Sequence, residues 1–187
     1  MDWEKYFIRP EEAVLVIVDV QEKLVKAMEE KVVSKVIKNI SILIEVAKGL
    51  GIPIMITEQY PKGLGPTIEE IKTVLPEYTS IEKITFDCCG EQRFLESLEA
   101  FGRRKVILTG METHICVYQT ALSLLNKGYC VFLPKDAVCS RREENWKTGL
   151  QLSILAGALP VDTETITFQL LQRAGTEEFK KLSVYFK

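Results

Sequence analysis

The sequence predicts an α/β protein built on one open parallel β-sheet of about six strands, with helices on both faces in a Rossmann-like three-layer sandwich. Short apolar, β-branched runs alternate with longer amphipathic segments along the chain. Several short runs are apolar without alternation, which is typical of parallel strands covered on both faces. No internal repeat, low-complexity stretch or Pro/Gly/Ser linker interrupts this order, so residues 1–187 are expected to form a single domain.

The predicted strands are short and apolar, and in chain order they are Ala13–Val18, Ile52–Thr57, Ser80–Ile84, Val106–Thr109, Cys130–Leu133 and Thr163–Ile166. The predicted helices are the longer segments between and after them: Val32–Leu50, Thr67–Leu75, Glu91–Phe101, His114–Asn126, Glu143–Ala156 and Thr176–Leu182. Ligands of such sheets bind at the carboxyl ends of the strands, near the switch in strand order. The residues that follow each strand are therefore the candidate site.

Composition narrows the functional classes. A net charge of −2 gives no footprint for nucleic acid or for an anionic membrane. No secretory signal pattern begins the sequence, and the apolar runs are too short to span a bilayer. Five cysteines without a C-x-x-C pair predict free thiols in a reducing compartment, so a cytoplasmic location is expected. With His114 as the one histidine and no zinc-like cysteine spacing, we expect neither a metal site nor a cofactor.

Cys116 is the most informative single residue. The apolar run Lys105–Gly110 reads as a strand that closes on a glycine, and helical spacing follows Cys116 directly. A thiol in the first turn of a helix faces unpaired backbone N–H groups and the positive end of the dipole, and both favour the nucleophilic thiolate. The alternative is that Cys116 is a small buried hydrophobe, as most free cysteines are.

Two further strand ends supply the groups that a nucleophilic cysteine needs. Asp19 follows an apolar strand, where it acts either as a general base or as a cap for the helical segment from Glu22. Lys83 lies between apolar neighbours and either points into the same crevice or is an ordinary solvated lysine. Together they predict a base and a cation for Cys116, with backbone N–H groups of the Glu112–Cys116 turn as an oxyanion hole.

These residues carry a family resemblance. The segments Leu15–Gln21, Glu82–Phe86 and Gly110–Val117 resemble, in the same order, the motifs of the isochorismatase-like cysteine hydrolases, including the YcaC-like subgroup. The resemblance extends over about Pro10–Leu171, nearly the whole chain. It implies a hydrolase in which a thiolate attacks a carbonyl carbon and water then resolves the covalent intermediate.

The resemblance also implies particular roles for residues of this chain. The catalytic triad would be Asp19, Lys83 and Cys116. A non-proline cis peptide would fall at Met111–Glu112 and would direct the N–H groups of Glu112 and Cys116 at the oxyanion. The substrate is expected to be a small molecule, and the residues predicted to contact it are Gln21, Gln59, Tyr60 and Thr113.

One departure from the family bears on the substrate. Nicotinamidases of this family hold a metal with an aspartate and two histidines after the second strand, whereas Thr57–Gly65 contains no histidine. A metal-independent reaction on a small amide is therefore favoured. The alternatives are hydrolysis of a vinyl ether, as in isochorismatases, and a binding or scaffold protein without turnover. A receiver domain is disfavoured because Val20 and Gln21, and not a second acidic residue, follow Asp19.

Assembly is expected from the family resemblance, whose members usually form homo-oligomers. Two apolar C-terminal segments are candidates for contact with a second copy, Phe168–Leu171 and Val184–Phe186. The alternative is that both segments close the core of a single chain.

Overall fold

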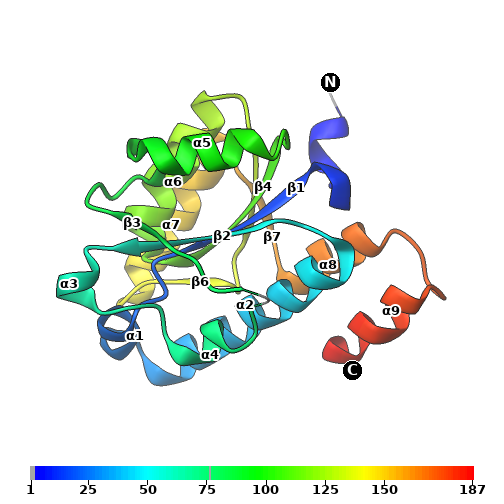
Figure 1. The fold of residues 1–187 in the computed structure, drawn as a ribbon, viewed down its shortest axis with the longest axis horizontal. Helices are drawn as coiled ribbons and strands as arrows, with labels where there is room; N and C mark the ends of the chain where they lie inside the picture. Colours follow the sequence, from blue (N-terminus) through cyan, green and yellow to red (C-terminus); the bar gives the residue numbers. More distant parts are fainter. Residues whose placement is uncertain (1–2, 76) are drawn as a thin grey trace.

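The computed structural model describes residues 3–75 and 77–187, and in them one sheet of seven strands carries the fold (Figure 1). The strands are β1 (Ala13–Val18), β2 (Ile54–Gln59), β3 (Ile81–Lys83), β4 (Lys105–Met111), β5 (Cys130–Pro134), β6 (Val138–Cys139) and β7 (Leu159–Val161). Their order is β3-β2-β1-β4-β5-β7, with β6 paired to β4, and every pairing is parallel. The predicted open parallel sheet is confirmed.

Helices cover both faces of the sheet (Figure 1). One layer contains α2 (Glu30–Leu50), α4 (Glu69–Lys72), α8 (Thr163–Leu171) and α9 (Glu177–Leu182). The other contains α5 (Gln92–Ala100), α6 (Tyr118–Asn126) and α7 (Glu143–Ala156). Two short helices, α1 (Glu22–Ala27) and α3 (Pro61–Leu64), follow the carboxyl ends of β1 and β2.

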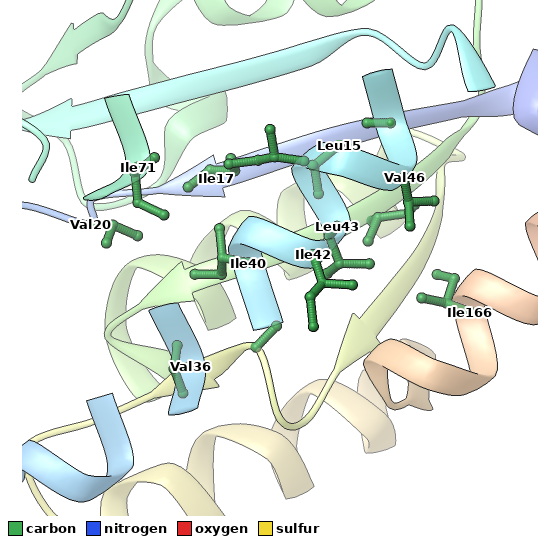
Figure 2. Close-up of a cluster of buried hydrophobic side chains, with 14 of the residues drawn as sticks. Leu15, Ile17, Val20, Val36, Ile40, Ile42, Leu43, Val46, Ile71 and Ile166 are labelled. Carbon is green, nitrogen blue, oxygen red and sulfur yellow. The ribbon is translucent and has the colours of Figure 1, made fainter. Parts of the chain in front are cut away.

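The central strand β1 explains why its sequence is apolar without alternation. All six of its residues are fully buried, because both of its faces are covered. Leu15 and Ile17 pack toward Ile40 and Leu43 of α2 (Figure 2). Val16 and its neighbours on the opposite face join the cluster beneath α5, α6 and α7. Each face thus buries its own apolar layer, which is the main stabilising contribution of such a sandwich.

One predicted strand is wrong. Thr163–Ile166 is β-branched, yet it forms the first half of helix α8, and the seventh strand lies just before it at Leu159–Val161. The side chain of Asp162 accepts a hydrogen bond from the backbone N–H of Thr165 at 2.7 Å and so caps the helix. Ile166 and Leu170, four residues apart, then bury one face of the helix, and this packing outweighs the local strand propensity.

The strand order changes direction between β1 and β4. From β1 the chain builds β2 and β3 on one side, and then β4, β5 and β7 on the other. Gly110 permits the close contact of these two strand ends, since it has a φ of 106° and an added Cβ would lie 2.0 Å from the carbonyl oxygen of Val18. This switch point is where ligands bind in open parallel sheets, so it is the first place to look for a site.

Candidate functional site

Three side chains predicted from separate strand ends meet at this switch point. Lys83 Nζ lies 2.7 Å from Asp19 Oδ2, and both side chains are fully buried. Cys116, which is 5 % exposed, lies close enough to Asp19 for the thiol and the carboxylate to interact. Asp19 follows β1, Lys83 ends β3 and Cys116 lies in the turn after β4, so the parallel sheet itself brings these residues together.

The Asp19 carboxylate is held in a fixed orientation. Its backbone has a φ of 52°, a left-handed conformation that non-glycine residues seldom adopt. Thr57 Oγ1 donates a hydrogen bond to Oδ1 at 2.7 Å, and Lys83 occupies Oδ2. The side chain therefore does not cap the helix from Glu22, which was the alternative reading of its position. It lies between a hydroxyl, an ammonium and a thiol.

The Lys83 ammonium has four acceptors in the described structure. Besides Asp19, Gln59 Oε1 accepts a hydrogen bond from Nζ at 2.7 Å. The backbone carbonyl oxygens of Thr85 and Phe86 accept at 3.3 and 3.2 Å. The loop after β3 thus closes around the ammonium, and the alternative of a solvated surface lysine is excluded because the residue is only 2 % exposed.

Burial sets the protonation of these groups. It raises the pKa of the Asp19 carboxyl, and the neighbouring Lys83 and Thr57 only partly offset this effect. Burial is the largest single effect on Lys83 and lowers its pKa, but the interactions of Lys83 with Asp19, Cys88 and Cys116 together outweigh burial, so the net pKa is raised and the ammonium stays charged. Burial, followed by the charge of Asp19, raises the pKa of Cys116. The resting sulfur is therefore a protonated thiol.

A protonated resting thiol differs from the thiolate that the position of Cys116 near a helix start favours. The residue lies in a π-helical turn, Thr113–Val117, which precedes α6. The helix-start argument accounts for the dipole but not for the depth of burial or for the adjacent carboxylate, and these two factors dominate. A buried base in contact with a buried thiol is the arrangement that transfers a proton only when the sulfur attacks.

The turn that carries Cys116 is held from two sides. The peptide bond between Met111 and Glu112 is cis, as the family resemblance implies. The Glu112 carboxylate accepts hydrogen bonds from Arg141, at 2.9 Å from its backbone N and at 3.0 Å from Nε. On the opposite side, Gly149 of α7 packs so closely that an added Cβ would lie 2.6 Å from the backbone N of His114.

The residues predicted to contact substrate lie in different environments. Gln21 is fully engaged with the protein: its Oε1 accepts from the Gln59 N–H, and its Nε2 donates to the carbonyls of Gln59 and Gly65. Gln59 divides its amide between Lys83 and the carbonyl of Ile84. Both glutamines therefore position other groups, and each polar atom of the two side chains has at least one described hydrogen-bond partner.

Tyr60 and Thr113, unlike the two glutamines, are not held by hydrogen bonds that the structure describes for their side chains. Tyr60 is 52 % exposed and has a φ of 38°, with its ring over Gly63. Thr113 is fully buried, and within the described residues its Oγ1 has no hydrogen-bond partner. A polar atom that is buried without a partner is uncommon, so this hydroxyl in the turn that carries Cys116 remains a candidate for substrate contact.

Sequence reasoning missed two polar residues at the end of β2. Thr57 contacts Asp19, as described above, and also lies 3.8 Å from the Sγ of Cys88. Glu58 points to the other side of the strand, where it accepts hydrogen bonds from the N–H and hydroxyl of Thr67 at 2.6 and 2.8 Å and from Tyr78. Both residues could have been identified from the sequence, because they belong to a run of polar residues that ends an apolar strand.

The five cysteines are free, as the sequence predicts, and the described hydrogen-bond partner of the His114 ring is none of Asp19, Lys83 and Cys116. Cys88 is fully buried near Asp19 and Lys83, and burial raises its pKa to about 12. His114 Nδ1 pairs with Ser140 Oγ at 3.0 Å.

Among residues 3–75 and 77–187, no group of three or more His, Cys, Asp or Glu side chains is arranged to hold a metal ion. No helix in that same part of the chain is long and apolar enough to cross a membrane.

The C-terminal apolar segments partly close the core of this chain. Leu170 and Leu171 are buried, and the ring of Phe168 contacts those of Phe179 and Phe186 at centroid distances of 6.2 and 5.7 Å. Val184 and Tyr185 remain exposed, at 52 and 42 %. The first segment is therefore mainly intramolecular, and the second retains an apolar surface.

Comparison with known proteins matches this architecture. The family model of the isochorismatase domain covers residues 13–165. The secreted isochorismatase effector Isc1 of Phytophthora sojae is 34 % identical over 95 % of this chain and 86 % of its own. The structure of MAR1 ribonuclease from Caenorhabditis elegans is 33 % identical, with a TM-score of 0.89 over 96 % of this chain and 91 % of that one.

A more distant structure has the same fold. The YcaC gene product of Escherichia coli, described as an octameric hydrolase of unknown specificity, has a TM-score of 0.87 at 22 % identity and covers 96 % of this chain and 90 % of its own. The domain match and the relatives above 30 % identity agree on one family. The chain therefore belongs to the isochorismatase family, and this membership supports a hydrolase function.

Proposed function

We propose that this protein is a metal-independent cysteine hydrolase that cleaves the C–N bond of a small amide, with Asp19, Lys83 and Cys116 as its catalytic triad. One observation carries the proposal. The buried Asp19 carboxylate contacts the Cys116 thiol on one side and the Lys83 ammonium, at 2.7 Å, on the other. A base, a fixed cation and a thiol at the switch point of a parallel sheet are the groups that covalent acyl transfer requires.

The reaction follows from these contacts. Asp19 takes the thiol proton as Sγ attacks the carbonyl carbon, and the carbonyl electron pair moves onto oxygen. The N–H groups of Glu112 and Cys116 stabilise that oxyanion. When the tetrahedral intermediate collapses, the C–N bond breaks and Asp19 returns the proton to the leaving amine. Asp19 then removes a proton from water, which attacks the thioester, releases the acid and restores the thiol. Lys83 holds the carboxylate in place throughout.

A panel of small uncharged amides tests this function through the release of ammonia or amine. We expect at least one amide to be hydrolysed without added metal and with chelator present. A vinyl ether is included because isochorismatase-type cleavage is the alternative within the family. Labelled RNA is included because one relative is named a ribonuclease, and the net charge of −2 predicts no cleavage of it. A protein that turns over nothing and whose Cys116 resists thiol probes would instead be a silent binding or scaffold protein.

Thr57 allows a sharper test through the pH profile. Because its hydroxyl donates to the carboxylate, Thr57→Val removes a bond that favours the charged form of Asp19. We expect the acid limb of kcat/KM, which lies above the ordinary carboxyl range because burial raises the pKa of Asp19, to move further upward by about one pH unit. Thr57→Ser keeps the hydroxyl and should restore the original limb. An unchanged limb in Thr57→Val would contradict the role of Asp19 as the base.

We further propose that the protein acts in the cytoplasm as a homo-oligomer, with a small molecule as its substrate. Free buried thiols support a reducing compartment. Exposed apolar residues on the outer face of α7, Leu152, Ile154 and Leu155, support contact with a second copy, since Leu155 is 77 % exposed. Sedimentation velocity tests the assembly, and a single-chain mass would contradict it.

A further inference from the structure

A cavity lies at the carboxyl edge of the sheet, and Asp19, Lys83 and Cys116 are not among the residues that line it. It is a groove of about 480 Å³ between the start of α2, strand β6 and the start of α7. Its floor is apolar and buried, formed by Val36, Val138 and Cys139. Val32 and Trp146 form its sides. This volume lies within the range of small-molecule sites, and an apolar floor of this kind fits a hydrocarbon body.

The rim of the groove is rich in cations. Lys31 and Lys35 are four residues apart on α2, so they lie on the same face of the helix. Lys135 and Arg141 approach from the loops beside β6. Within the described parts of the chain, none of the three lysines forms an ion pair. Arg141 bonds Glu112 through its backbone N and Nε, which leaves its two terminal nitrogens without a described acceptor.

Three acidic residues also line the groove, and two of them are engaged. Asp136 Oδ1 accepts hydrogen bonds from the backbone N and the hydroxyl of Thr163, at 2.9 and 3.0 Å. Glu143 forms an ion pair with Lys147 at 2.7 Å. Glu29 is the remaining carboxylate. Arg141 and Glu143 are each balanced by an ion pair, with Glu112 and Lys147 respectively. The remaining charges are those of three lysines against Glu29 and Asp136, which leaves the groove with a small excess of positive charge.

We propose that this groove binds a small amphipathic carboxylate, with its apolar body on Val36 and Val138 and its carboxylate among Lys31, Lys35 and Arg141. The positive ends of two long helices support this choice of charge. Both α2 and α7 begin at the groove, and neither receives a side-chain cap at its N-terminus. A bound carboxylate would also contact Arg141, which holds Glu112 in the nucleophile turn. The inference does not depend on the proposed hydrolysis.

The fluorescence of Trp146 tests the proposal. The sequence has two tryptophans, so Trp3→Phe leaves Trp146 as the reporter. The probes are cyclohexanecarboxylate and, as a neutral match, cyclohexylmethanol, neither of which absorbs in the tryptophan range. We expect saturable binding of the carboxylate with a Kd on the order of 1 mM, and at least about tenfold weaker binding of the alcohol. Added salt should weaken the binding of the carboxylate but not that of the alcohol.

Matched charge variants complete the test. Lys31→Gln combined with Lys35→Gln should weaken carboxylate binding about tenfold, because each exposed lysine contributes modestly. Glu29→Gln should strengthen it. Equal binding of the alcohol and the carboxylate, or an unchanged Kd in the double lysine variant, would overturn the proposal. So would a groove that gives no saturable signal and whose lysine variants alter the oligomeric state, because that result would make the surface a contact between copies.

Discussion

Replacing Cys116 with alanine lowers kcat/KM by at least about 10³-fold, because no other described group is placed to form the covalent intermediate. The fold should survive, since a buried thiol is small and its loss costs on the order of 1 kcal/mol of unfolding free energy. Cys116→Ser keeps nearly the same shape, yet its hydroxyl is a far weaker nucleophile and holds its proton more strongly, so it should be almost as inactive. Steady-state kinetics and thermal unfolding check both variants.

Cys88 provides the matched control. It is also fully buried, and its Sγ lies 3.8 Å from the same Thr57 hydroxyl, but it belongs to the short 3₁₀ helix before α5 and not to the nucleophile turn. Cys88→Ser should therefore retain most of the activity. If Cys88→Ser were inactive and Cys116→Ala active, the two thiols would have to exchange roles.

Replacing Lys83 with methionine lowers both stability and activity. The substitution preserves the unbranched shape but leaves the Asp19 carboxylate buried without a cation, beside the Thr57 hydroxyl and the Cys116 thiol. Removing one partner of a buried ion pair costs about 3–5 kcal/mol of unfolding free energy. The pKa of Asp19 should also rise further, so the base would be protonated over a wider pH range. Chemical denaturation and kcat/KM measure the two effects.

The double variant Asp19→Asn with Lys83→Met separates the two effects. Asparagine is isosteric with aspartate and tolerates the left-handed backbone at this position, where φ is 52°. With both charges gone, no uncompensated ion remains, and we expect stability to return to within about 1–2 kcal/mol of the native protein. Activity should stay absent, because the base is lost. A double variant as unstable as Lys83→Met alone would contradict the account of this ion pair.

The fold was largely predictable because its signal is local. The burial of β1 on both faces is visible as six apolar residues in a row, and Ala13–Val18 has the predicted bounds. The helix Glu143–Ala156 is also predicted to the residue. The predictions that failed concern segments whose secondary structure is determined by contacts with residues elsewhere in the chain. Thr163–Ile166 becomes helical through its cap and its packing, and the two-residue β6 exists only because it pairs with β4.

The charged residues of the site could be predicted from the sequence, but the residues that surround and orient them could not. Asp19 and Lys83 are identifiable because each follows or ends an apolar run. The partners that orient them are distant in sequence: Thr57 is 38 residues from Asp19, and Gln59 is 24 residues from Lys83. No local pattern reports such pairs. The protonation of Cys116 depends on the depth of burial and on the nearby Asp19, which raise its pKa against the effect of the helix start, and one segment of sequence cannot reveal either.

The measurement that most directly tests the central claim is the mass of the enzyme during turnover. With an amide substrate from the panel, rapid acid quenching and intact mass analysis should reveal an increase equal to the acyl group. Peptide mapping should locate this group on Cys116. Hydroxylamine added during turnover should divert the thioester to the acyl hydroxamate. Turnover that yields no hydroxamate, or an acyl group carried by any residue other than Cys116, would contradict the account.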